Sequence, residues 1–302
     1  MKAESQPVYD VLPQENNLVE KYHPKFLACG GDHLVYEIPE HPDVVVKAST
    51  FRIKDILVDN AEHGVPLDSL SDGMREFVGT ELKEKDEQSR NLRNYFGNEH
   101  TLAERRFLMK VPVTGEIVAD IFKDDWKGRV PPEDSLNMNE AWSSVTVQQR
   151  AEAINDPKHL SLNFEGFLEE DKYDDTAIQH ILTLSENNPA LRDSLKEFVS
   201  KAVSYANETG NILAMAGKDN IIFYKDPENG EKWNYLLVDA LSIHNEPVFK
   251  VAQEISLKII NGEKITPHEQ TLLMKALNFT RTINNIASAL GMSEHLGLQT
   301  EL

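Results

Sequence analysis

The chain has 302 residues, of which 40% are hydrophobic and 27% charged, as expected for one two-lobed globular domain or two small ones. Its net charge of −19 argues against a nucleic-acid or membrane-surface partner, because such a chain repels nucleic acid and anionic lipid unless it has a basic patch, and the sequence shows none. No apolar run is long enough to span a bilayer, the N-terminus lacks a signal-peptide core, and the single cysteine, Cys29, rules out an internal disulfide, so we expect a cytoplasmic protein.

The first part of the chain predicts three antiparallel strands. Residues 1–24 are polar and irregular, and we expect a surface lead-in. Three short apolar runs follow, separated by turns that contain glycine or proline. These runs cover residues 26–29, 34–38 and 44–47. Gly30 and Gly31 occupy the first turn, where glycine allows either a close backbone approach to a ligand or simply a tight hairpin.

An insertion and a helix are expected next. Residues 51–75 mix charged and apolar residues with glycine and proline, which predicts an insertion without regular structure. Residues 76–96 are rich in helix formers and stop before Gly97, a residue type that commonly follows a helix C-terminus.

More β structure is predicted before the middle of the chain. Residues 107–113 and 116–122 are apolar runs around Thr114-Gly115 and predict a pair of strands. The segment 126–139 is rich in proline and charge and predicts a loop. Residues 141–149 alternate in polarity as a strand does.

The remaining chain is mostly helical in pattern. Apolar residues recur at helical spacing from Pro189 to about Glu208, and Gly210 follows them. Shorter helical patterns cover residues 176–184 and 251–259. A further helix opens at Thr266 with a capping box and closes at Gly291.

One stretch, residues 210–239, carries the clearest functional signal. Two apolar runs, 221–224 and 233–238, flank the turn-rich sequence KDPENGEK and predict a hairpin. Asn220 precedes the first strand and Asp239 follows the second, so we expect their side chains to meet. An amide oxygen and a carboxylate beside open space suit Mg²⁺, which proteins usually hold with one or two groups plus phosphates. The alternative is an ordinary hairpin with polar ends.

This stretch resembles the active centre of the protein-kinase-like superfamily. Residues 210–223 align without gaps on the kinase pattern G-I-V-H-R-D-L-K-P-E-N-I-L-L, which places Asn220 on the catalytic-loop asparagine. Asp239 matches the metal-binding aspartate of Asp-Phe-Gly, although alanine and leucine follow it. The position of the catalytic aspartate is occupied by Met215. Asp219 replaces that base only if the loop is shifted from this alignment.

The N-terminal strands resemble the nucleotide-binding half of the same superfamily. Against G-x-G-x-x-G-x-V, Gly30 and Val35 match, and Gly31 lies in the same turn. Twelve residues after Val35, the sequence VVVK resembles the strand that carries the phosphate-binding lysine and places Lys47 there. The resemblance implies that a glutamate of helix 76–96 orients Lys47. Glu84 is preferred over Glu87, and a solvated acidic face is the alternative.

The resemblance covers residues 25–245 and implies an α+β, two-lobed kinase-like fold. An antiparallel β N-lobe with one main helix spans 25–149, and a mostly helical C-lobe spans 150–302. ATP would bind between the lobes, with Gly30, Gly31, Val35, Lys47 and Glu84 around the nucleotide and Asn220 and Asp239 on Mg²⁺.

Three functional hypotheses follow from that resemblance. Without the catalytic aspartate, we expect a pseudokinase or weakly active phosphotransferase, with Asp239, Asn220 and Asp219 as the residues at the catalytic position. The alternatives are an active atypical kinase acting on a protein or small molecule, and an interaction module that binds no nucleotide. Other chemistries lack support, because the ten histidines and Cys29 show no zinc spacing and no Walker loop or nucleophile elbow occurs.

Overall fold

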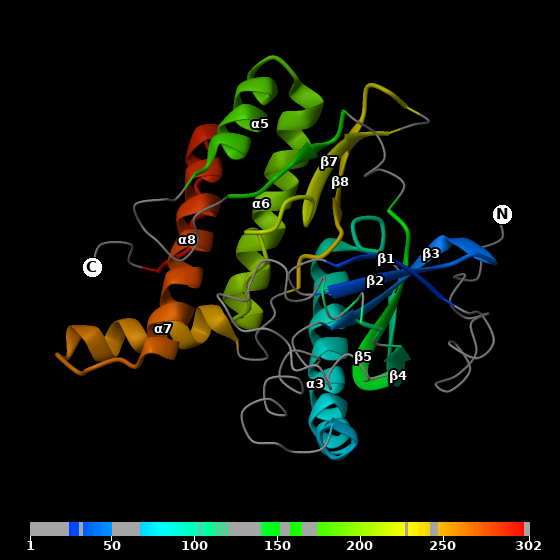
Figure 1. Cartoon of the computed structure of the whole chain (residues 1–302). Coiled ribbons are helices and arrows are strands. Elements are labelled where there is room, and N and C mark those ends of the chain that lie inside the picture. Colours follow the sequence, from blue (N-terminus) through cyan, green and yellow to red (C-terminus); the bar gives the residue numbers. More distant parts are fainter. Residues whose placement is uncertain are drawn as a thin grey trace. The chain divides into compact units, whose positions relative to one another are not determined.

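The structure is a computed structural model of the whole chain, shown in Figure 1. It describes residues 24–29, 33–49, 67–102, 104–112, 114, 115, 117, 119, 140–151, 158–164, 174–226, 229–241 and 247–298. These residues form an α+β structure with antiparallel sheets. The chain divides into two compact units. The first unit is Met1–Asp86 with Ala103–Arg150, and the second is Glu87–Leu102 with Ala151–Leu302.

The first unit contains a five-stranded antiparallel sheet in the order β1-β2-β3-β5-β4. Its strands are β1 (Lys25–Cys29), β2 (His33–Ile38), β3 (His41–Ser49), β4 (Glu104–Pro112) and β5 (Glu140–Gln149). The three strands predicted near the N-terminus and the strand at 141–149 are confirmed. In β2, buried and half-buried residues alternate strictly, so one face of the sheet forms the core of this unit.

The strand expected at residues 116–122 is wrong at Ile117 and Ala119, and the other residues of that range lie outside the described residues. Gly115, Ile117 and Ala119 are helical, and β4 pairs instead with β5, far along the chain. An apolar run of this length is ambiguous between helix and strand when read alone, and the tertiary partner decides. The proposed loop at 126–139 lies outside the described residues.

The main helix of this region, α3 (Leu67–Phe96), begins earlier than predicted. Its last ten residues belong to the second unit, and Gly97 follows it with φ +90° as expected. The insertion predicted at 51–75 is therefore wrong for residues 67–75. Composition misleads here because glycine and proline are typical of loops, whereas proline also suits a helix start and glycine is tolerated inside a helix.

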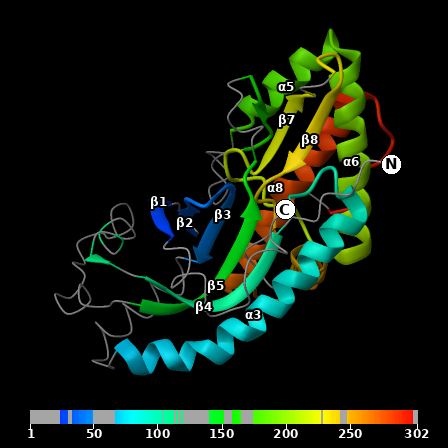
Figure 2. The same ribbon diagram turned by 90° about the vertical axis from the view of Figure 1, so that its right-hand side faces the viewer.

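The second unit combines a small sheet with four helices and holds most of the buried side chains described in the structure. The sheet order is β6-β7-β8, with β6 (Leu160–Ser161), β7 (Ile221–Lys225) and β8 (Trp233–Leu237). The helices besides the end of α3 are α5 (Thr176–Glu186), α6 (Pro189–Thr209), α7 (Val248–Ile260) and α8 (Pro267–Leu290). Within this unit, α6 lies between α8 and the β7–β8 hairpin (Figures 1 and 2). None of the described helices is both long and apolar enough to cross a bilayer.

The ends of α6 and α8 follow their sequence signals. Asn188 accepts a hydrogen bond from the Leu191 N–H, and Gly210 ends α6 with φ +74°. At the start of α8, Thr266 and Glu269 form the predicted reciprocal capping box. The Glu269 carboxylate also accepts a hydrogen bond from Lys258 of α7 at 2.6 Å, so the cap joins two helices.

This cap makes stability depend on pH. The hydrogen bond from Lys258, followed by those from Thr266, lowers the pKa of Glu269 from 4.5 to about 2. Because the folded-state pKa is depressed, the contribution is fully present above the unfolded pKa and is lost as pH falls from about 4.5 towards 2. We expect Glu269→Gln to destabilise the chain near neutral pH and this penalty to shrink through that window. Urea denaturation at several pH values measures it. The exposed turn residue variant Glu231→Gln is the control, and a penalty that stays constant with pH would contradict the prediction.

Candidate functional site

The base of the β7–β8 hairpin brings Asn220 and Asp239 together in the second unit. The strands pair in register from Ile221–Leu237 to Lys225–Trp233. At the open end, the carbonyl of Asn220 accepts hydrogen bonds from the N–H groups of Val238 at 2.8 Å and Asp239 at 3.3 Å. The predicted hairpin is therefore confirmed and its two ends are joined through the main chain, whereas the meeting of the Asn220 and Asp239 side chains stays a prediction.

The side chain of Asn220 is oriented by two features of the preceding loop. Its Nδ2 donates to the carbonyl of Ala214 at 3.0 Å. Gly217 leaves room for it, because a Cβ at that position would lie 2.5 Å from the same Nδ2. With the nitrogen committed to the backbone, Oδ1 is the amide atom suited to bind a cation.

The loop is also joined to the segment that follows Asp239. Leu213 pairs with Leu241 in an isolated antiparallel bridge, and the Ala214 N–H donates to the Ala240 carbonyl at 2.9 Å. Met215, which the resemblance aligns with the kinase base, is 1% exposed and belongs to the core of this unit. A buried thioether cannot act as a proton acceptor, so this position supplies no general base.

Asp219 is held by β6, the strand on the other side of β7. Its N–H donates to Ser161 Oγ at 2.8 Å, and its Oδ1 lies 3.0 Å from Nε2 of His159. Neither partner is predicted by the sequence. They lie 58 and 60 residues away, and a two-residue strand has no periodicity by which to recognise it.

The N-terminal candidates lie in the first unit. Lys47 on β3 stands in register with Val35 on β2 and Thr146 on β5, so the three side chains share one face of the sheet. Gly30 and Gly31 lie outside the described residues.

The same face of the sheet is in contact with α3. Arg106 on β4 is in register with Thr146, and its side chain is 5% exposed. Its guanidinium donates to the Lys85 carbonyl of α3 at 3.3 Å and lies 3.4 Å from the Asp86 carboxylate. The sequence analysis missed this residue. Glu84 is half-buried on the same helix, and its pairing with Lys47 stays a prediction.

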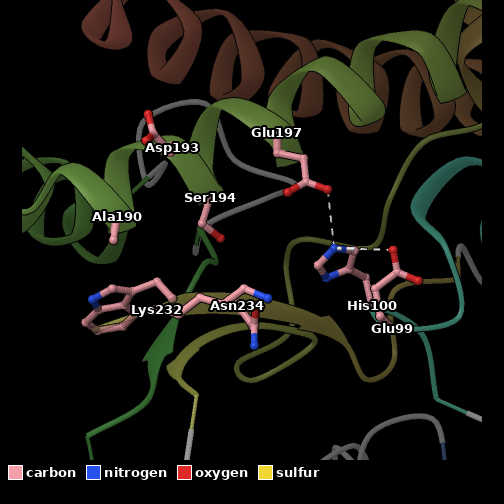
Figure 3. A pocket seen from close by; sticks show the side chains of 9 residues that line it. Glu99, His100, Ala190, Asp193, Ser194, Glu197, Lys232 and Asn234 are labelled. Carbon is pink, nitrogen blue, oxygen red and sulfur yellow. Dashed lines mark ion pairs between the residues drawn. The ribbon is translucent and has the colours of Figure 1, made fainter. Parts of the chain in front are cut away.

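A separate cavity of about 510 Å³ lies within the second unit (Figure 3). One face of α6, the turn after α3 and the start of β8 line it. His100 stacks on Tyr235 at 3.7 Å, donates from Nδ1 to the Tyr235 carbonyl, and places Nε2 3.4 Å from Glu197. Burial raises the pKa of the Glu197 carboxyl, but the hydrogen bond from Lys201, the nearby Lys201 charge and His100 together hold it below its usual range. None of the predicted site residues lines this cavity.

The described residues contain no cluster of three or more His, Cys, Asp or Glu side chains able to hold a metal ion. Asn220 and Asp239 would provide two oxygen ligands, which fits a cation completed by phosphate oxygens better than an all-protein cage. The sequence matches no protein-family profile, and a search of curated proteins finds no significant match.

A double-mutant cycle tests whether the Asn220 amide occupies the space beside Gly217. We expect Gly217→Ala to destabilise the protein by about 1–3 kcal/mol, because the added methyl group displaces the Asn220 amide. In an Asn220→Ala background the same change should cost much less, since the clash is gone. Chemical denaturation measures both values. Gly230→Ala, where a Cβ meets no atom within 4 Å, is the control. Equal costs in the two backgrounds would show that Asn220 does not occupy this space.

Proposed function

We propose that this chain is a divergent kinase-like protein that binds ATP with Mg²⁺ and transfers phosphate weakly or not at all. The observation that carries the proposal is the base of the β7–β8 hairpin. There, Asn220 and Asp239 are neighbours through their backbones, and the Asn220 amide is fixed by Ala214 and Gly217.

The chemistry of this pair supports a magnesium role. Amide and carboxylate oxygens are the hard ligands that Mg²⁺ prefers, and Mg²⁺ typically keeps waters or phosphates in its other positions. The bound ion would neutralise charge on the nucleotide phosphates. In this proposal the chain contributes the amide oxygen of Asn220, whose direction is fixed, and the carboxylate of Asp239, which follows β8.

The first unit supports the proposal through a candidate phosphate-binding lysine, Lys47. Lys47 lies on the face of the five-stranded sheet that contacts α3 through Arg106. In the proposal, Lys47 binds the α- and β-phosphates and Glu84 orients its ammonium group. The net energy of such an ion pair is often near zero, so the pair would serve to orient Lys47 and not to add stability.

The environment of Met215 favours a pseudokinase over an efficient enzyme. A positioned general base is typically worth about 10²–10⁴-fold in rate. Met215 is buried in the core, and the nearest alternative in sequence, Asp219, already accepts a hydrogen bond from His159. Metal and nucleotide binding do not require that base. The protein would work in the cytoplasm as a nucleotide-dependent partner of a protein or small molecule.

Nucleotide binding is the first prediction of this proposal. Titration calorimetry should detect binding of ATP in the presence of Mg²⁺ and much weaker binding with EDTA. Asp239→Asn and Lys47→Met should each weaken the affinity at least about tenfold, equivalent to ~1.4 kcal/mol. Asp193→Asn, an exposed change on α6, should leave it unaltered. Binding that is insensitive to Mg²⁺ and to both variants would rule out this site.

Phosphate transfer is the second prediction. Single-turnover reactions with γ-labelled ATP should give at most slow transfer to the protein, to water or to a generic protein acceptor. Robust transfer by the wild type that Asp239→Ala abolishes would identify an active atypical kinase instead.

A further inference from the structure

The backbone of the turn before Asn220 is held in an unfavourable conformation. Asp219 has φ +62°, the only positive value at a non-glycine residue among the described part of the chain. Aspartate tolerates this left-handed region better than most residues, but the conformation persists only where surrounding contacts enforce it.

Two polar side chains of the β6 segment supply such contacts. Ser161 Oγ accepts the hydrogen bond of the Asp219 N–H at 2.8 Å. His159 Nε2 donates to Asp219 Oδ1 at 3.0 Å, since the carboxylate can only accept. The side chains of His159 and Asp219 are only 15% and 26% exposed, so water competes weakly for this contact.

The opposite side of the turn is held by the segment after β8. The Asn220 carbonyl accepts two N–H groups there, and the Asn220 N–H donates back to the Gly217 carbonyl at 3.3 Å. Because β6 and β8 flank β7 on its two sides, the turn is restrained from both directions. Asn220 is the residue between the two sets of restraints.

We propose that His159 and Ser161 are positioning residues that fix the Asn220 amide for metal binding by clamping Asp219. This inference rests on the proposed function. It assigns the Asp219 carboxylate to the clamp and not to proton transfer. The argument is geometric: one side chain holds the Asp219 main chain, the other holds its carboxylate, and the next residue along the chain is the proposed ligand.

Two pairs of variants distinguish the effect of losing a contact from the effect of changing the residue. His159→Leu and Ser161→Ala remove one contact each, whereas His159→Gln and Ser161→Thr keep a donor or an acceptor at similar reach. Loss of groups that orient metal ligands typically weakens metal affinity about 10–100-fold. We expect a loss of this size in Mg-ATP affinity for the first two variants and near-complete recovery in the second two. The control is His180→Leu, an exposed change on α5.

Two further measurements make the result decisive. Amide hydrogen exchange of peptides covering residues 213–220 should accelerate in His159→Leu and Ser161→Ala, with little change in melting temperature. If the wild type binds Mg-ATP and neither affinity nor exchange responds, the clamp is overturned. Affinity losses that follow melting temperature, without rescue by the conservative variants, also overturn it. If the wild type does not bind Mg-ATP, the proposed function fails, and with it the metal-positioning role, while exchange still reports whether the clamp holds the turn.

Discussion

The main-chain carbonyl of Asn220 is the junction on which the candidate site depends. It accepts the N–H groups of both Val238 and Asp239, so one oxygen joins the residue before β7 to the two residues after β8. Each such hydrogen bond contributes only about 0.5–1.5 kcal/mol net, but leaving a buried partner unsatisfied costs more. The geometry of the two side chains is therefore tied to the integrity of the hairpin itself.

One face of the β7–β8 hairpin packs against aromatic rings of neighbouring helices. Phe198 of α6 contacts Phe223 of β7 and Tyr235 of β8, with ring centroids 5.8 Å and 5.5 Å apart. Phe96 at the end of α3 adds a further edge contact to Tyr235. Such ring pairs contribute about 0.5–1.5 kcal/mol each beyond the area that they bury. Side chains at the ends of strands fixed in this way are positioned more exactly than side chains on a free loop.

The structural features that depend on a few adjacent residues are the ones that the sequence predicts correctly. The hairpin, the capping box at Thr266 and the glycine after α6 each depend on a few adjacent residues, and each is confirmed. The contacts of the β6 segment with Asp219 could not be predicted in this way, because His159 and Ser161 meet Asp219 only after the chain has returned from α6. The partner of β4 was missed for the same reason: the pairing of β4 with β5 is decided by packing across a long separation.

The loop before Asn220 treats the two proposed site positions, Asn220 and Met215, differently. Asn220, the proposed metal ligand, is held by main-chain hydrogen bonds, whereas Met215, at the position proposed for the base, packs in the core of the second unit. An aspartate placed at Met215 without other changes would bury a carboxylate in an apolar environment, where an unpaired charge costs several kcal/mol or becomes protonated. A base could return only if the loop also turned this position outward, which would disturb the bridge between Leu213 and Leu241. The packing that buries Met215 therefore disfavours a general base at this position, which agrees with the proposed binding of nucleotide without efficient transfer.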